Sequence, residues 1–276
     1  MASYDSERNC HVVRIVYDGP GLAGKTTNLE RICERVPTES RSEMVTPAAL
    51  RGRTMFFDWL EINGPPIDGK GLVFQLISVP GQAQRNYRRR PLVEVADVVV
   101  VVCDATPDGI RDTQRVWAQL RVSIQSRDTE VPVVLQANKQ DIEGKLTDQQ
   151  LRRRLRVDES VPLYPAVAVD GKGVWETLVA AMRLGVRTID SETVAPLLPA
   201  FANPDALFDH VLEFEDRPHD DQPTVVEEIN FAHDEAGDAA DNAALEEEML
   251  ASVRSMDDLE ERARRAAMGE KGSRGR

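Results

Sequence analysis

The sequence predicts an α/β protein in which a mostly parallel, six-stranded sheet has helices on both faces. Between residues 12 and 187, short apolar runs alternate with amphipathic segments, which is the pattern of consecutive β-α units. Residues 98–103 read VVVVVC, as expected for a strand at the centre of a sheet that is covered on both faces. A chain of 276 residues is longer than a typical domain, so we expect one such domain and an extension.

The apolar runs are the predicted strands, and the amphipathic segments between them are the predicted helices. One connection differs, because the strands expected at 55–62 and 72–79 are separated by GPPIDGKG. This run predicts a hairpin loop over 64–71 and therefore one antiparallel pair. In chain order the expected strands are 12–17, 55–62, 72–79, 98–104, 131–137 and 163–169, and the expected helices are 25–35, a short one near 84–95, 111–126, 147–156 and 174–186.

The composition changes after residue 189. Residues 190–276 carry 23 acidic and 8 basic side chains, and the preceding residues carry 24 acidic and 26 basic ones, so the net charge of −13 originates in this tail. Five prolines between residues 196 and 223 interrupt the same stretch. We therefore expect a globular domain at 1–189, a disordered acidic, proline-containing linker at 190–242, an amphipathic helix at 243–267 and a disordered basic end at 268–276.

Two parts of the tail contain enough apolar residues to make contacts. Residues 206–214 are short and apolar enough to dock on another surface. Residues 243–267 place apolar side chains at alternating spacings of four and three, which suits either a partner-binding helix or a lone, marginally stable one. An acidic tail repels nucleic acid, so we expect no nucleic-acid partner.

The cysteines and the termini indicate the compartment. Cys10, Cys33 and Cys103 stand far apart, without metal-site spacing, which suits a reducing cytosol. The sequence shows no signal-peptide core, no lipidation motif and no apolar run long enough to span a bilayer. The expected location is therefore cytoplasmic, without an intrinsic membrane anchor.

Residues 19–27, GPGLAGKTT, match the phosphate-loop pattern G-x-x-x-x-G-K-[ST] between a predicted strand and a predicted helix. Small residues let the backbone N–H groups of such a loop face phosphate oxygens, while Lys25 reaches the β- and γ-phosphates and the Thr26 hydroxyl ligates Mg²⁺. The sequence therefore predicts a nucleoside triphosphate site, whose candidate residues here are Gly19, Gly21, Leu22, Ala23, Gly24, Lys25, Thr26 and Thr27.

Residues 138–141, NKQD, follow the strand expected at 131–137 and predict the base. The Asp141 carboxylate can accept two hydrogen bonds from the N1–H and the amine of guanine, which adenine cannot supply. A buried carboxylate left unpaired rejects the wrong base by roughly 10⁴ in favourable cases. Asn138 would brace the loop, and the stem of Lys139 would cover the base.

Three stretches carry a family resemblance: residues 19–29, residues 53–58 (RTMFFD) and residues 78–82 (SVPGQ). In them the chain resembles Ras-like small GTPases and, within that group, the MglA family of bacterial gliding-motility and cell-polarity GTPases. The resemblance covers residues 9–189 and implies the three-layer fold of phosphate-loop NTPases, with the acidic tail as an extension. Val167 and Ala168 then lie where small GTPases place an amide that contacts guanine O6, although an ordinary strand end fits them equally well.

The resemblance also implies the catalytic residues. Gln82 corresponds to the glutamine that orients the attacking water, and Gly81 would offer its N–H to the γ-phosphate. Arg53 corresponds to a built-in arginine finger, although Arg51 beside it and a role as an exposed loop residue remain alternatives.

The resemblance implies a metal-binding threonine as well. Thr54 is the second Mg²⁺ ligand that it indicates, in a segment that closes only when the γ-phosphate is present. Thr46, which is nearer the phosphate loop, competes for this role.

Ser78 stands where most small GTPases have an aspartate that helps to hold Mg²⁺. Taken alone, this serine indicates a weakened metal site, whereas MglA-like proteins also carry a hydroxyl residue there. Asp104 ends an apolar strand and could be mistaken for the missing carboxylate. It lies one strand too late in the chain, so we expect it to cap the loop before the helix at 111–126 instead.

The predicted function is therefore a GTP-binding and GTP-hydrolysing switch with Mg²⁺ as cofactor. By resemblance, its partners are effectors and a Roadblock-fold activating protein of the MglB kind, and its process is cell polarity or surface motility, with recruitment to a cell pole. Ser78 leaves open a non-hydrolysing scaffold, and Asp141 argues against an ATP-using protein. Arginines 85, 88, 89 and 90 after Gln82 fit a solvated face, an effector surface or a contact for the acidic tail.

Overall fold

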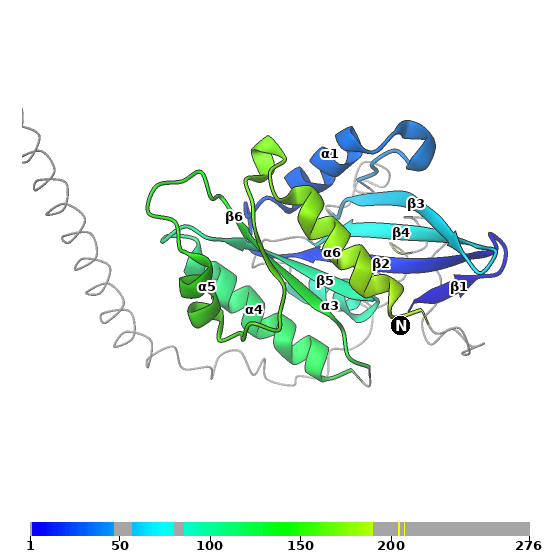
Figure 1. Ribbon diagram of the computed structural model, residues 1–276. Coiled ribbons are helices and arrows are strands. Elements are labelled where there is room, and N and C mark those ends of the chain that lie inside the picture. Colours follow the sequence, from blue (N-terminus) through cyan, green and yellow to red (C-terminus); the bar gives the residue numbers. More distant parts are fainter. Residues whose placement is uncertain are drawn as a thin grey trace, which may run out of the picture. The chain divides into compact units, whose positions relative to one another are not determined.

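The computed structural model describes residues 2–46, 57–79, 86–127 and 129–189, together with Pro204 and Leu207 (Figure 1). They form a mixed, mostly parallel sheet with helices on both faces, as expected, but the sheet has seven strands where the sequence predicts six. The elements in order are β1 (Ser3–Asp5), β2 (Cys10–Asp18), α1 (Lys25–Arg35), η1 (Thr38–Ser40), β3 (Trp59–Ile67), β4 (Lys70–Ser78), α3 (Asn86–Glu94), β5 (Val98–Asp104), α4 (Ile110–Gln125), β6 (Val133–Asn138), α5 (Asp148–Leu155), β7 (Leu163–Pro165), η3 (Ala168–Asp170) and α6 (Val174–Val186).

The sheet is parallel except at two places. Its strand order is β3-β4-β2-β5-β6-β7, and β1 pairs antiparallel with β2. The strands β4, β2, β5, β6 and β7 run parallel, and β3 pairs antiparallel with β4. The parallel strands therefore share one carboxyl edge, where Asp18, Asp104 and Asn138 are the last residues of β2, β5 and β6.

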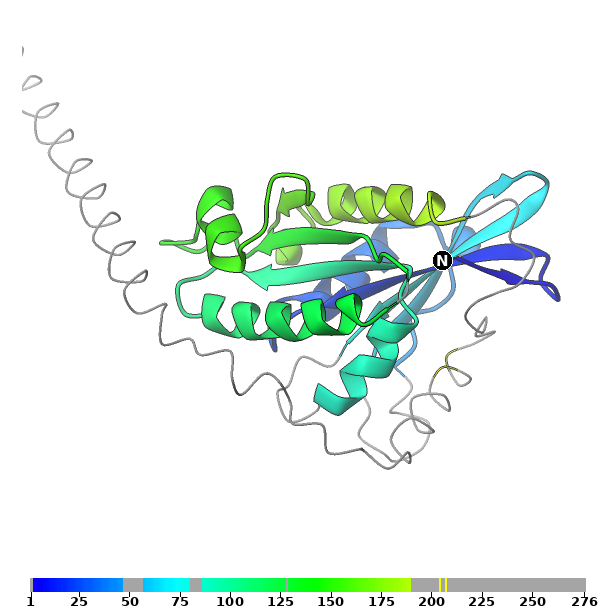
Figure 2. The ribbon, with the colours of Figure 1, turned by 90° about the horizontal axis from the view of Figure 1, so that it is seen from below.

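Two apolar clusters lie on opposite faces of the sheet and divide its helices. In Figure 2, in the colours of Figure 1, α6 (yellow-green) lies on one side and α3 and α4 (teal to green) lie on the other. Trp59 and Leu60, which are neighbours on β3, belong to different clusters because side chains alternate along a strand. Strand β5 is buried at every position, as the sequence predicts.

The hairpin is tighter than the sequence predicts. Both strands continue into the run expected to be a loop, and only Asp68 and Gly69 separate them, with φ angles of 50° and 76°. Positive φ at both central residues is the signature of a two-residue turn whose twist matches the strands. Pro65 and Pro66 are tolerated because the register between β3 and β4 shifts between Gly64 and Ile67, so that neither proline has to donate a ladder hydrogen bond.

Contact density divides the chain into two units, residues 1–220 and 221–276, and the described residues all lie in the first. Among the described residues, no helix is long and apolar enough to cross a membrane. Leu207 is fully buried and belongs to the cluster that also contains Trp59 and Leu92. The predicted boundary at residue 189 stays a prediction.

Candidate functional site

The phosphate loop connects β2 to α1 at the carboxyl edge of the sheet, and two glycines set its path. At Gly24, φ is 100°, and a Cβ would lie 2.4 Å from Asn138 Nδ2. At Gly19, a Cβ would lie 2.3 Å from the carbonyl oxygen of Val102 on β5. Only glycine fits at either position, so the loop lies directly against its neighbours. Gly21 and Leu22, near its tip, are exposed.

Lys25 is the first residue of α1, and its side chain is buried. Its Nζ donates hydrogen bonds to the carbonyl oxygens of Gly19 and Pro20, at 2.9 and 2.6 Å. Burial lowers the pKa of Lys25 to about 8; Asp18 and Asp58 act to raise it, and Arg89 acts to lower it. The loop therefore contains a desolvated ammonium group beside backbone that accommodates no Cβ, which is the environment a polyphosphate requires.

Asn138 joins three segments that are far apart in sequence. Its Nδ2 donates to the carbonyl oxygen of Ala23 in the phosphate loop, at 2.7 Å. Its Oδ1 accepts the backbone N–H of Ala168, at 2.9 Å. The phosphate loop, residues 138–141 and the segment at Val167 and Ala168 are therefore held together by one buried amide. The N–H of Ala168, which the sequence offers for guanine O6, is donated to Asn138 in this structure.

The residues after Asn138 present a carboxylate to solvent. Lys139 has a φ of 66°, and its ammonium group pairs with Asp104. The second oxygen of Asp104 accepts both the N–H and the hydroxyl of Thr106, at 3.1 and 2.7 Å. Asp104 thus orients the 138–141 loop and the turn before α4. Asp141 is exposed at the end of this loop.

The carboxylate beside the predicted metal ligand belongs to Asp58, which sequence reasoning missed. Asp58 is buried, and its Oδ2 accepts hydrogen bonds from the hydroxyls of Thr26 and Ser78, each at 2.7 Å. Its Oδ1 accepts the hydroxyl of Thr46 at 2.9 Å. The backbone N–H of Asp58 also donates to Ser78 Oγ, at 3.1 Å. A carboxylate is therefore present at this position although residue 78 is a serine.

Two signals in the sequence could have indicated Asp58. It is the last residue of one of the stretches that carry the family resemblance, and the serine at position 78 required a replacement carboxylate from another strand. Hydroxyl and carboxylate oxygens are the ligands that Mg²⁺ prefers, so the donor set of Thr26 and Asp58 fits this ion. Thr46, the alternative switch threonine, lies in the same cluster. Arg53, Thr54, Gly81 and Gln82 lie outside the described residues.

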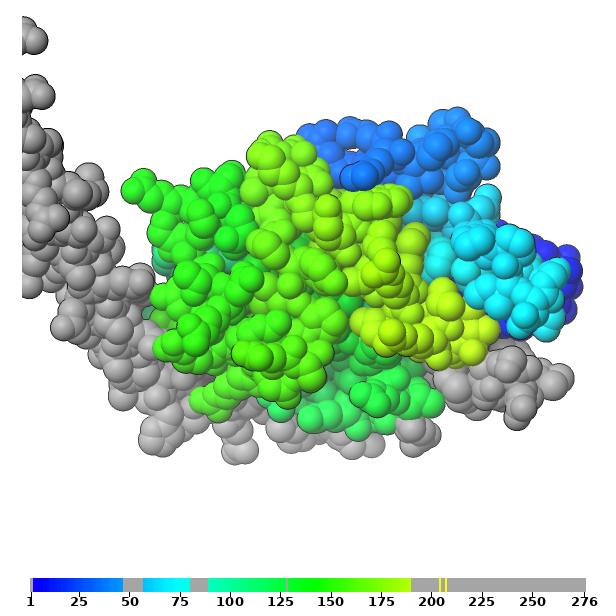
Figure 3. Space-filling model, in the orientation of Figure 1, coloured from blue at the N-terminus to red at the C-terminus, as the bar shows by residue number. Residues whose placement is uncertain are grey.

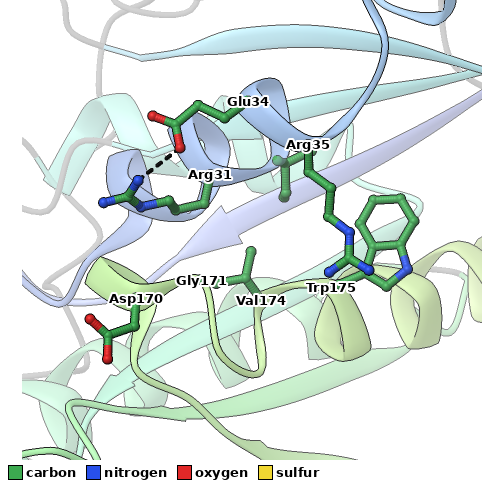
Figure 4. Close-up of a pocket in the computed structure, with 8 residues that line it drawn as sticks. Arg31, Glu34, Arg35, Asp170, Gly171, Val174 and Trp175 are labelled. Atoms are coloured by element: carbon green, nitrogen blue, oxygen red, sulfur yellow. Dashed lines mark hydrogen bonds and ion pairs between the residues drawn. The ribbon is translucent and has the colours of Figure 1, made fainter.

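A groove of about 300 Å³ lies between α1 and the start of α6, apart from these residues (Figure 4). The two helices are neighbours on the face shown in Figure 3, where α1 is blue and α6 is yellow-green. The Arg35 guanidinium stacks over the Trp175 ring, 4.6 Å from its centre, and Arg31 pairs with Glu34 at 2.8 Å. The residues lining the groove belong neither to the phosphate loop nor to residues 138–141, so this groove is not the nucleotide site.

Comparison with known proteins identifies the family. No protein-family model matches the chain. The chain is 34% identical over 181 residues to the mutual gliding-motility protein MglA of Myxococcus xanthus, a match that covers 64% of this chain and 91% of that protein. It is 32% identical over 178 residues to human ADP-ribosylation factor-like protein 4D, covering 61% of this chain and 79% of that protein. With the phosphate loop and residues 138–141 at one edge of the sheet, this chain belongs to the MglA family of Ras-like small GTPases, which bind guanine nucleotides and hydrolyse GTP.

Proposed function

We propose that the protein is a nucleotide-dependent switch of the MglA type, which controls cell polarity or surface motility through the partners it binds in its GTP-bound state. The observation that carries this proposal is the buried Asn138 amide, which joins the phosphate loop to the guanine-reading loop. Because these two loops are braced against each other, the base and the phosphates of one nucleotide can be read together.

The described side chains have distinct roles in nucleotide binding. Lys25 would exchange its two carbonyl partners for phosphate oxygens, a charge-assisted interaction that is stronger than the bonds it replaces. Asp141 is free to accept the two N–H groups of guanine. Asp104 keeps Lys139 beside this site, where the lysine stem would lie against the base.

Thr26 and Asp58 would hold Mg²⁺, directly or through water, with Thr54 or Thr46 as a further ligand. The ion, when bound, neutralises charge on the phosphates. The contact of Asp58 with Thr26 and Ser78 supports this assignment, because these two hydroxyl groups already share one of its oxygen atoms as acceptor. Ser78 then positions the carboxylate that most small GTPases carry at its own position.

Hydrolysis would use Gln82 to orient the attacking water, Gly81 to bind the γ-phosphate and Arg53 to stabilise charge in the transition state. We propose a Roadblock-fold activator of the MglB kind and effector proteins as partners, and recruitment to a cell pole. The acidic tail, divided at residues 189, 242 and 267, would be an extension of the GTPase domain.

A side-by-side titration with fluorescent GDP and ADP in Mg²⁺ tests the proposed specificity. We expect tight binding of GDP and negligible binding of ADP. Asp141→Asn is the informative variant, because its amide offers a donor in place of one acceptor. The variant should lose affinity for GDP and gain affinity for xanthosine diphosphate, which carries a carbonyl where guanine has an amine. Equal binding of GDP and ADP by the unsubstituted protein would overturn the guanine assignment.

The alternative function, a nucleotide-bound scaffold that does not hydrolyse GTP, was suggested by Ser78. The Asp58 carboxylate beside Ser78 weakens that argument, since the proposed metal site would keep an acidic group. Release of phosphate over many turnovers, with and without an activating partner, separates the two functions. The scaffold predicts no release of phosphate under either condition.

A further inference from the structure

The phosphate loop begins at a buried ion pair that the predicted roles do not use. Asp18 is the last residue of β2, and its side chain is fully buried. Its Oδ2 accepts hydrogen bonds from Arg89 Nη2 at 2.6 Å and from Arg89 Nε at 3.0 Å. Its Oδ1 accepts the N–H of Gly19, the first residue of the loop, at 2.8 Å. The carboxylate thus connects the start of the loop to a guanidinium on α3.

Helix α4 holds Arg89 in this orientation. Arg89 Nη1 donates to Gln119 Oε1, and Nη2 donates to the carbonyl oxygen of Val116, both at 3.3 Å. The Arg89 side chain is only 6% exposed. Neither a solvated face nor an effector surface describes this arginine, although the sequence offers both readings. A charge buried to this extent is strongly destabilising once its partner is removed.

The neighbouring Arg90 makes a different contact. Arg90 is exposed, and it pairs with Glu94 one turn further along α3, at 2.8 Å. Arg90 and Arg89 are adjacent in sequence and identical in chemistry, and only one of them reaches the phosphate loop. Arg90 is therefore a matched control for Arg89.

The ion pair lies within electrostatic reach of the phosphate-binding lysine. The pKa of Lys25 is lowered chiefly by burial, and after burial the largest influences on it are those of Asp18, which raises it, and Arg89, which lowers it. Without Arg89, the Asp18 carboxylate would be an uncompensated negative charge at the base of a loop that must bind phosphates. Such a charge acts strongly there because the surroundings exclude water.

We propose that Asp18 and Arg89 form a positioning pair that makes tight nucleotide binding depend on the seating of α3 against the phosphate loop. Helix α3 begins directly after residues 80–85, which include the candidate residues Gly81 and Gln82. A partner that displaced α3 would withdraw the guanidinium, expose the phosphates to the charge of Asp18 and hasten release of the nucleotide. This inference rests on the proposed function, because it assigns regulation to that same site.

The dissociation rate of fluorescent GDP from the full-length chain in Mg²⁺ tests this proposal. Arg89→Met should accelerate release by roughly tenfold or more, because Asp18 is left uncompensated. Asp18→Asn should release GDP no faster than the unsubstituted protein. The double variant Asp18→Asn/Arg89→Met should return to within about threefold of the unsubstituted rate, because neither charge remains. Arg90→Met, the matched control, should not change the rate.

A purely mechanical link predicts a different pattern. Either single variant would then accelerate release to the same extent, and the double variant would be no slower than the single ones. That pattern, or an unchanged rate in Arg89→Met, would overturn the proposal. If Arg89→Met does not fold, Asp18→Asn and the double variant decide, since accelerated release in both contradicts the electrostatic role.

The binding titration with fluorescent GDP and the release rates together separate this inference from the proposed function. If neither the unsubstituted chain nor Arg90→Met binds GDP, the proposed function fails and the inference fails with it. If both bind GDP and the double variant does not rescue release, only the inference fails.

Discussion

At the scale of single residues, Lys25 and Asp58 are the buried charged side chains proposed to bind the phosphates and Mg²⁺. Lys25 donates to carbonyl oxygens of its own loop, and Asp58 accepts the hydroxyls of three side chains from separate segments. Each charge is paired with dipoles that a ligand can replace. We therefore expect nucleotide binding to depend on the protonation of Lys25 and on the Mg²⁺ that Asp58 would hold.

The pKa of Lys25 predicts how nucleotide affinity depends on pH. In the structure this pKa is about 8, and phosphate oxygens favour the ammonium form, so binding GDP should take up a proton above that pH. Affinity for GDP should be constant below pH 8 and fall above it, by at most about tenfold per pH unit. Calorimetric titration from pH 7 to about pH 9.5 measures this; a flat profile would contradict it. Lys25→Arg, which stays charged, should remove the dependence.

The same pKa has the opposite consequence for stability without nucleotide. Between pH 8 and 10.5 the unfolded chain holds the Lys25 proton while the folded chain has lost it. Burial of the charged Lys25 side chain destabilises the folded chain, and this destabilisation is fully present below pH 8. It is relieved as the pH rises from 8 to 10.5, so the free energy of unfolding increases across this window.

Asp58→Asn should weaken the dependence of GDP binding on Mg²⁺. The amide keeps the size of the side chain but loses the charge that attracts the cation. In excess Mg²⁺ the variant should release fluorescent GDP roughly tenfold faster than the unsubstituted protein. In EDTA the two proteins should release it at the same rate, and this second measurement excludes a general disturbance of the fold. Glu61→Gln, three residues further along the chain and paired with Arg8, is the control. Equal rates in Mg²⁺ would remove Asp58 from the metal site.

At the scale of elements, the junction of the phosphate loop with α1 depends on the absence of a side chain. Gly24→Ala should abolish GDP binding, because the new Cβ would meet the Asn138 amide that braces the loops. Gly171→Ala is the matched control, since Gly171 also has a positive φ, of 73°, but no atom within 4 Å of the place that a new Cβ would take. It should cost about 1 kcal/mol of stability and leave GDP binding intact. Equilibrium dialysis with labelled GDP distinguishes the two variants, and similar losses in both would show that φ alone matters.

The sequence predicts most elements closely because their cores are uninterrupted apolar runs. Its errors occur where local signals conflict with tertiary ones. The glycine and two prolines at 64–66 predict a loop, but β3 continues through them to Ile67, with a shift in its register against β4 between Gly64 and Ile67. The short β1 has no apolar run of its own and exists because β2 offers it a partner. The strand expected at 163–169 ends at Pro165, because residues 168–170 form η3 around the Asn138 brace.

At the scale of the whole molecule, the described part of the chain does not end with α6. Leu207 is fully buried in the cluster beneath α3 and α4. Leu207→Ala in the full-length chain should therefore lower the free energy of unfolding by about 2–5 kcal/mol, as for other buried leucines. Val122→Ala, at an exposed position on α4, should change it by less than about 0.5 kcal/mol. Urea unfolding measures both, and a loss below about 1 kcal/mol for Leu207→Ala would show that residue 207 lies outside the folded core.

The sequence by itself determined the nucleotide chemistry, because that information is local. The phosphate loop and the predicted guanine-reading tetrad are each contiguous segments. Each motif can therefore be recognised from its own residues, without knowing where the segment lies in the fold. Tertiary structure alone decided which distant side chains complete the site. Asp58 lies beside Thr26 and Ser78, Arg89 reaches Asp18 across 71 positions, and Asn138 reaches Ala23 across 115. The parallel strands bring their carboxyl ends to one edge of the sheet, and the antiparallel β3 brings its amino end there. Burial at that edge then requires each of these charges and amides to have a partner, which no pattern within a single segment can specify.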